Sequence, residues 1–190
     1  MKNGLVLDAS VIINVLGSGV GERVLSALST RLIVADVTSR EIVRNPLSIS
    51  DRTNPIEAFA ARRLLERRAV DGEALQTFIG LVGATPPDDL GDGESGAIAL
   101  AKHLDLAVAL DDGKARRICR NRFPNVEIVA SAEIFAHANV AAALGTSLAD
   151  AVHGAMLHAR MRVLPEHREW VASVLGERAD AFPVLRKARG

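Results

Sequence analysis

The chain has 190 residues, of which 48% are hydrophobic and 24% charged, and its 23 basic and 23 acidic side chains cancel to a net charge of zero. This length and composition are typical of one globular domain, with or without an appendage, that buries a substantial core. The balanced charge excludes a global positive field, so any nucleic-acid site must be local. Cys119 is the only cysteine, which excludes an intrachain disulfide and a cysteine-based zinc cluster.

The apolar run at the N-terminus follows a single lysine and ends at Asp8 after a few residues, which is unlike a signal peptide. No uninterrupted apolar stretch reaches the ~20 residues that a membrane span requires. We therefore expect a cytoplasmic protein with reduced cysteine and no membrane partner.

The first elements alternate between strand and helix patterns. Residues 4–8, GLVLD, predict a strand buried on both faces, and a helix follows that starts at Asp8 or Ser10. The glycines of GSGVG interrupt this helix before a helical pattern resumes over residues 22–30.

A second strand is predicted within residues 31–39. Thr38 and Glu41 form an S/T-x-x-E capping box, which predicts a helix start, and the helix would end near Asn45–Pro46. An Asn-Pro pair then predicts the start of one amphipathic helix over residues 54–70.

The rest of the first 130 residues continues the alternation. Helices are predicted over residues 71–83, 94–104 and 113–123, and strands over residues 106–112 and 126–131. This order predicts a three-layer α/β/α sandwich with a central parallel sheet. Only helical patterns follow, so we expect one α/β domain over residues 1–130. Residues 131–190 would be a helical extension packed on that domain or on a second copy.

Acidic residues fall at strand ends and helix starts at four places, namely Asp8, Glu41, Glu94 and the pair Asp111–Asp112. Most have an ordinary structural explanation: Asp8 suits a helix N-cap worth about 1 kcal/mol, Glu41 a capping box, and Glu94 a first helical turn. The pair Asp111–Asp112 is harder to explain, because a cap needs one carboxylate and two repel each other.

Convergence of these acids would indicate a metal site. Ligands collect at the carboxyl ends of parallel strands, and one strand order places Asp8 beside Asp111. Hard oxygen ligands favour Mg²⁺ or Mn²⁺. Two such ions can activate water and stabilise the leaving oxygen of a phosphodiester.

Other site classes fit less well. A haloacid-dehalogenase phosphatase would have a second aspartate two residues after Asp8, where Ser10 stands. The segment GSGVGER lacks the lysine of a P-loop and follows a helix rather than a strand. The five histidines show no ligand spacing.

Three segments resemble the motifs of PIN-domain nucleases. LVLDASVIINVL resembles the opening of that family, and VTSREIVRN resembles its second motif. LGDGESGAIALAKHLDLAVALDDGKARRIC is similar to the third and fourth motifs of a bacterial and archaeal branch, with the pattern LGxGE…AIxLA…DD…AR. The resemblance covers about residues 4–130 and includes VapC-like toxins.

The resemblance implies that Asp8, Glu41, Glu94 and Asp111 are catalytic and bind the metal, with Asp112 in a neighbouring metal-binding place. Asp92 competes with Glu94 for one position, and the pattern selects Glu94. The implied activity is an Mg²⁺- or Mn²⁺-dependent endoribonuclease, a hydrolase that acts as the toxin of a toxin–antitoxin pair. An antitoxin protein and a second copy of the chain are the implied protein partners. A regulatory or binding module with weak or no catalysis, or an RNA-processing nuclease without antitoxin, stays an alternative.

The expected RNA contacts are polar. By resemblance the Ser10 hydroxyl lines the site. The basic run after the two aspartates would form a phosphate-contacting rim beside it, unless it is a solvated helix face; it consists of Arg116, Arg117, Arg120 and Arg122. Arg40 and Arg44 flank Glu41 in the same way. With no Tyr and one Trp, the chain offers no platform for stacking bases, so recognition would depend on backbone charge and RNA shape.

Overall fold

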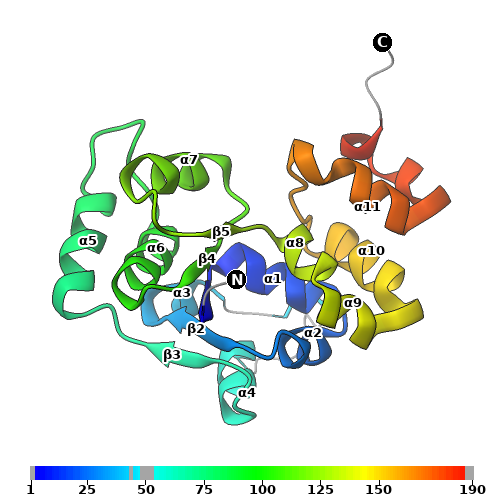
Figure 1. Ribbon diagram of the computed structural model, residues 1–190, viewed down its shortest axis with the longest axis horizontal. Helices are drawn as coiled ribbons and strands as arrows, with labels where there is room; N and C mark the ends of the chain where they lie inside the picture. Colours follow the sequence, from blue (N-terminus) through cyan, green and yellow to red (C-terminus); the bar gives the residue numbers. More distant parts are fainter. Residues whose placement is uncertain (1–2, 43–44, 48–53, 187–190) are drawn as a thin grey trace.

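The computed structural model describes residues 3–42, 45–47 and 54–186. Within these ranges, five short strands form a parallel sheet in the order β3-β2-β1-β4-β5. Helices cover both faces of this sheet, so the fold is the three-layer α/β/α sandwich that the sequence predicts (Figure 1). The strands are β1 (Gly4–Leu7), β2 (Arg31–Ala35), β3 (Glu66–Arg68), β4 (Ala107–Ala109) and β5 (Ile128–Val129).

The central strand shows why both faces are covered. Consecutive side chains of a strand point to opposite faces of the sheet. Leu5 and Leu7 of β1 belong to one hydrophobic cluster, and Val6 between them belongs to a second cluster on the other face. A strand that is apolar at every position must therefore be packed on both sides, which fits a parallel sheet between helical layers.

The first hydrophobic cluster lies between the sheet and the helices drawn to the right in Figure 1. They are α1 (Ala9–Gly17), α2 (Gly21–Ala27), α8 (Ser131–Ala136), α9 (Ala138–Leu144), α10 (Leu148–His158) and α11 (Arg168–Leu175), with α4 (Pro55–Ala61) near the sheet edge. Short 3₁₀ turns continue this layer at Gly145–Ser147, Pro165–His167, Gly176–Ala181 and Pro183–Leu185.

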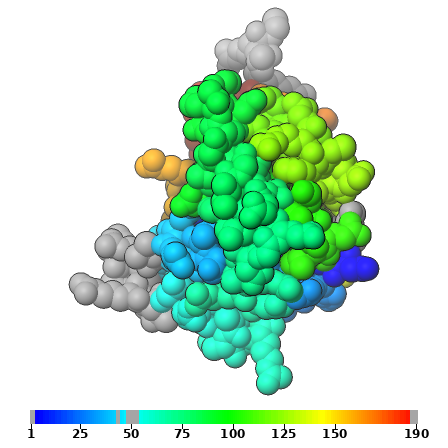
Figure 2. Space-filling view, turned by 90° about the vertical axis from the view of Figure 1, so that its left-hand side faces the viewer, coloured from blue at the N-terminus to red at the C-terminus, as the bar shows by residue number. Residues whose placement is uncertain are grey.

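The second cluster lies under the helices drawn to the left, and Figure 2 views this side of the molecule, where residues of the α5 region form much of the surface. The helices are α5 (Gly72–Val82), α6 (Asp92–Leu104) and α7 (Gly113–Arg122), and the short α3 (Asp36–Glu41) packs against α6.

The single helix predicted over residues 54–70 is wrong. Helix α4 ends at Ala61, the backbone turns at Arg63 with a left-handed φ of 59°, and the chain then forms the edge strand β3. The side chains of β3 are charged and largely solvated, and Glu66 Oε2 lies 2.8 Å from Arg31 Nη2 on β2. An edge strand tolerates such charge, so the segment lacks the apolar alternation that marks a strand in sequence.

The predicted capping box of Thr38 and Glu41 is also wrong. Helix α3 begins at Asp36 with Ala35 as its N-cap, three residues before the start that a Thr38 N-cap predicts. The side chains of Thr38 and Glu41 instead bond to the backbone of Gly93 at the start of α6. Both residues therefore join two helices rather than cap one.

The C-terminal helices pack on the rest of the same chain. Helix α10 approaches α1 so closely that a Cβ atom on Gly154 would lie 2.8 Å from the carbonyl oxygen of Gly17. Val152 of α10 belongs to the same hydrophobic cluster as Val15 of α1. The stretch Ala138–His158 is long and apolar enough to span a membrane by composition, and the core accounts for that apolar character where α10 lies against α1.

The close contact between the two helices gives a first prediction. In Gly154→Ala the new methyl group meets backbone that cannot rotate away, and such overpacking typically costs about 1–3 kcal/mol. We expect a lower melting temperature, by roughly 2–4 °C for each kcal/mol lost. Gly113→Ala is the matched control, because no atom lies within 4 Å of its added Cβ. Equal melting temperatures for the two variants, measured by circular dichroism, would contradict this packing.

Candidate active site

The sheet changes direction between β1 and β4. The chain proceeds from β1 outward to β2 and β3, and then returns to place β4 on the other side of β1. Leu7 pairs with Ala109 across this junction, and the Asp8 N–H donates to the Ala109 carbonyl at 3.2 Å. The predicted adjacency of the two strand ends is confirmed. Such a switch point leaves a crevice at the carboxyl ends of the strands, where ligands bind in open α/β sheets.

A cavity of about 340 Å³ opens at this switch point. Four carboxylates line it: Asp8 follows β1, Glu94 lies in the first turn of α6, and Asp111 and Asp112 follow β4. The competing acid Asp92 is exposed and lies outside the cavity lining. The remaining lining residues are Ser10, Ile13, Asn14, Ala159, Arg160 and Arg162.

Asp8 is both a helix cap and a wall of the cavity. Its Oδ2 accepts hydrogen bonds from the Ser10 backbone N–H at 3.2 Å and from the Ser10 hydroxyl at 2.7 Å. The side chain is only 4% exposed. Burial raises the pKa of Asp8, repulsion from Asp112 adds to this, and the Ser10 hydrogen bonds oppose it.

Asp111 is held by residues from two helices. Its Oδ1 accepts from the Ser131 backbone N–H at 2.8 Å, and its Oδ2 accepts from the Ser131 hydroxyl at 2.5 Å and from Asn14 Nδ2 at 2.8 Å. Burial raises the pKa of Asp111, against the hydrogen bonds from Ser131. Sequence reasoning missed both partners. Asn14 gave a signal, because it is the polar residue in the apolar run VIINVLG.

Glu41 lies beside the cavity rather than on its lining. Its Oε1 accepts from the Gly93 backbone N–H at 2.9 Å, while the Thr38 hydroxyl donates to the Gly93 carbonyl at 3.1 Å. A Cβ atom at Gly93 would lie 2.6 Å from Glu41 Oε2, so this close approach requires glycine. The contact holds the Glu41 carboxylate against the first turn of α6, which carries Glu94.

Charge repulsion from Asp8 affects the pKa values of the neighbouring acids. Burial raises the pKa of Glu94, and repulsion from Asp8 and Asp112 raises it further. Burial likewise raises the pKa of Glu41, where the Gly93 hydrogen bond opposes the shift and Asp8 adds to it. The charge of Asp8 therefore raises the pKa of each of Glu41, Glu94 and Asp111.

Asp112 has a different environment from its neighbour. Its Oδ1 caps α7 by accepting from the backbone N–H groups of Lys114 at 2.7 Å and Ala115 at 3.0 Å. Its Oδ2 accepts from Arg162 Nη1 at 2.8 Å. Partial burial opposes ionisation, but these hydrogen bonds and the Arg162 charge outweigh it and lower the pKa of Asp112.

The expected basic rim lies away from the cavity lining in the described part of the chain. Arg116 is buried and donates from Nη1 to the Leu110 carbonyl at 2.9 Å. Arg117 pairs with Asp88 at 2.8 Å, and the exposed Arg40 lies 3.8 Å from Asp36. Arg44 lies outside the described residues. Of the residues proposed for RNA contact, Ser10 lines the cavity.

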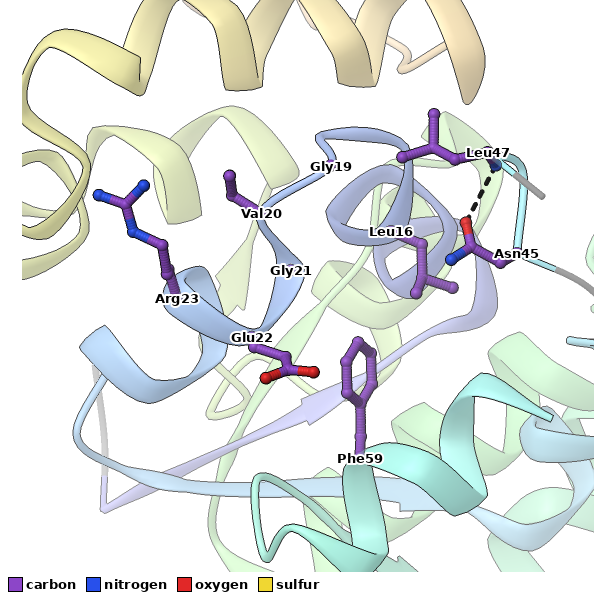
Figure 3. A pocket seen from close by; sticks show the side chains of 9 residues that line it. All are labelled: Leu16, Gly19, Val20, Gly21, Glu22, Arg23, Asn45, Leu47 and Phe59. Carbon is purple, nitrogen blue, oxygen red and sulfur yellow. Dashed lines mark hydrogen bonds between the residues drawn. The ribbon is translucent and has the colours of Figure 1, made fainter. Parts of the chain in front are cut away.

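A second cavity of similar size lies between α2 and the segment around Leu47 (Figure 3). Leu16 and Phe59 give it an apolar wall, and its charged side chains already have partners. Glu22 pairs with Arg62, and Arg23 donates to the Ala143 carbonyl at 2.8 Å. Its lining contains one carboxylate, so the acidic chemistry of the molecule lies at the switch point.

The residues at the switch point suit a hard divalent cation by donor type. Among the described residues, no three carboxylate, imidazole or thiol groups are close enough to hold one ion as they stand. Nevertheless, four carboxylates line one cavity, and burial and mutual repulsion raise the pKa of three of them. A cation would relieve that repulsion and supply the charge that the buried oxygens lack.

No protein-family model, curated protein or solved structure matches the chain.

The opposite pKa shifts of Asp8 and Asp112 give a second prediction, for protein in EDTA. The pKa of Asp8 is raised above its ordinary value of 3.8, so its contribution to stability is present below that value and lost as the pH rises through the folded-state pKa. The pKa of Asp112 is lowered, so its contribution is present above 3.8 and lost in acid.

At pH 7 we therefore expect Asp8→Asn to raise the melting temperature and Asp112→Asn to lower it. The difference for Asp8→Asn should shrink as the pH falls toward about 4, near the ordinary aspartate pKa. The difference for Asp112→Asn should persist at that pH and shrink only as the pH falls below 3.8. Thermal unfolding followed by circular dichroism across this range measures them. A lower melting temperature for Asp8→Asn at pH 7 would show that the carboxylate is stabilised rather than strained.

Proposed function

We propose that this protein is a Mg²⁺- or Mn²⁺-dependent endoribonuclease that hydrolyses RNA phosphodiester bonds at the switch-point cavity. The observation that carries this proposal is the convergence of Asp8, Glu94 and Asp111 on one cavity, from three elements far apart in sequence. The same residues are those that the motif resemblance to PIN-domain nucleases selects.

The roles follow from how each side chain is held. Asp8, Glu94 and Asp111 would bind the cation, with Asp112 and Glu41 at its margin. A bound divalent ion lowers the pKa of a water molecule and stabilises charge on the leaving oxygen. Ser10, Asn14 and Ser131 orient the buried carboxylates through the hydrogen bonds described above, as partners of metal ligands commonly do.

Removal of single carboxylates tests the reaction and gives a third prediction. Asp8→Asn and Asp111→Asn should each lower Mn²⁺-dependent cleavage of a labelled RNA by more than roughly 100-fold, since loss of an orienting partner alone costs about 10- to 100-fold. Asp150→Asn is the control, because this exposed acid pairs with Arg178 far from the cavity. Far-UV circular dichroism should be unchanged in all three. Metal-independent cleavage at the wild-type rate by either cavity variant would exclude the mechanism.

The proposed biological role is that of a toxin silenced by an antitoxin protein, with the chain acting as a homodimer. The motif resemblance supports this role, and the complete acid set favours an enzyme over a module that only binds. An RNA-processing nuclease would have the same cavity, so the two roles are distinguished by their effect on the growth of a host cell.

Expression of the chain alone in a bacterium gives a fourth prediction. A toxin should arrest growth, because cellular RNA is cleaved without an antitoxin to block the site, and Asp8→Asn should relieve the arrest at equal protein level. Colony counts and total-RNA gels after induction measure both effects. Normal growth with soluble wild-type protein that cleaves RNA in vitro would favour a processing nuclease. Normal growth without cleavage would favour a binding module.

A further inference from the structure

The C-terminal part of the chain contributes two cationic side chains to the acidic cavity. After α10 ends, Met161 and Val163 are each 4% exposed and belong to the core, whereas Arg160 and Arg162 are exposed and line the cavity. The two arginines therefore alternate along the chain with two residues that are buried in the core.

The packing of α10 on α1 fixes the position of this segment. A Cβ atom on Gly17 would lie 2.7 Å from the Cβ atom of Ala159, the residue that ends α10. The Met161 N–H donates back to the Ala155 carbonyl at 3.1 Å. Ile13 and Asn14 of α1 complete the lining between this end of the cavity and the carboxylates.

Neither arginine side chain contributes much to the stability of the fold. Arg162 pairs with Asp112 at 2.8 Å, but the arginine side chain is 59% exposed, and such surface pairs add little to stability. Arg160 has a left-handed φ of 55° just after the helix end, where glycine is the usual residue. An L-residue is strained in that conformation. In the described part of the chain, Arg160 takes part in no ion pair that would offset this cost.

The charges of the cavity indicate what the arginines bind. The ionised carboxylates would repel an RNA phosphate, and two guanidinium groups beside them provide the opposite charge. Arginine matches a phosphate group with paired N–H donors, which a point charge cannot do. The lining contains no aromatic residue, which favours a contact to the charged backbone over stacking of bases on aromatic rings.

We propose that Arg160 and Arg162 form the phosphate-binding side of the active site, so that the segment after α10 completes a site whose carboxylates come from the sheet. This inference rests on the proposed function. The bound group is a phosphate of the RNA backbone, held beside the carboxylates without reading base identity. Arg162 exchanges its pairing with Asp112 for the phosphate when RNA enters.

Binding of RNA without cleavage tests the inference as a fifth prediction. The probe is a fluorescein-labelled single-stranded RNA of mixed sequence in Ca²⁺, followed by anisotropy and checked on a gel for integrity. The variants are Arg160→Gly, Arg162→Ala and Arg162→Lys, and Arg178→Ala is the control, because Arg178 is an extension residue paired with Asp150 at 2.7 Å. The glycine variant is informative because it also removes the left-handed strain.

We expect Arg160→Gly and Arg162→Ala each to weaken binding roughly tenfold or more, as for loss of a hydrogen-bonded charge. Each should also reduce the slope of log K against log salt by about 0.7, the value for one single-strand phosphate contact. Arg162→Lys should keep that slope with intermediate affinity, and Arg178→Ala should match the wild type. The melting temperature of Arg160→Gly should be equal to or above that of the wild type, which separates a lost contact from a damaged fold.

Wild-type affinity and salt slope in both arginine variants would overturn the inference, as would a wild type that binds no RNA. Tighter binding or faster cleavage by Arg162→Ala would also overturn it, because Arg162 would then be an internal occupant that competes with RNA or metal. Cleavage by the wild type in Mn²⁺ is measured in parallel. A wild type that binds RNA through the arginines but never cleaves it contradicts the proposed function and leaves the phosphate contact standing.

Discussion

The repulsion between buried carboxylates at the ends of β1 and β4 is the constraint on which the site depends. Asp8 and Asp111 are 4% and 2% exposed; burial raises the pKa of both, and the charge of Asp8 adds to the shift of Asp111. Burying a charge is unfavourable unless hydrogen bonds or an opposite charge compensate. Polar donors do part of this work: Ser10 bonds to one acid, and Asn14 with Ser131 bonds to the other. The remaining imbalance is what a divalent cation would remove.

Because the buried carboxylates need hydrogen-bond donors, residues after position 130 form part of the site. Ser131, the first residue of the expected extension, donates two hydrogen bonds to Asp111. Further along, Arg162 reaches Asp112 from the segment after α10. The expected boundary at residue 130 therefore runs through the group of residues that holds the carboxylates, and the glycine contacts between α1 and α10 keep both parts in register.

Local sequence patterns predicted the helices and strands whose residues are buried, but they did not predict the long-range contacts. The strands that carry Asp8 and Asp111 are apolar at successive positions, so their place inside a parallel sheet and the meeting of the acids follow from general rules. Strand β3 was missed because its charged residues face solvent at the sheet edge. Asn14 and Asp111 are separated by 97 positions, and Arg162 and Asp112 by 50, so no sequence pattern links them.

Glu41 shows a different limit of sequence reading. Its spacing from Thr38 matches a capping box, and the structure uses the same two side chains to clamp Gly93 from both its N–H and its carbonyl. This contact explains why Gly93, the second glycine of LGDGE, has no side chain, because a Cβ atom there would collide with the Glu41 carboxylate in its present position. Two residues whose spacing suggests a local capping interaction can therefore instead form a contact between helices that are distant in sequence.

The adjacent acids Asp111 and Asp112 show how one pair of like residues divides two tasks. Asp111 is buried among hydroxyl and amide donors with a raised pKa, whereas Asp112 caps α7 and pairs with Arg162 with a lowered pKa. Two carboxylates in identical surroundings would repel each other without a compensating interaction. Because Asp112 bonds to both the start of α7 and the segment after α10, it joins the two sides of the cavity mouth. An anion that draws Arg162 away from Asp112 leaves the helix cap in place, so the cavity can accept a phosphate without loosening the strand end that carries Asp111.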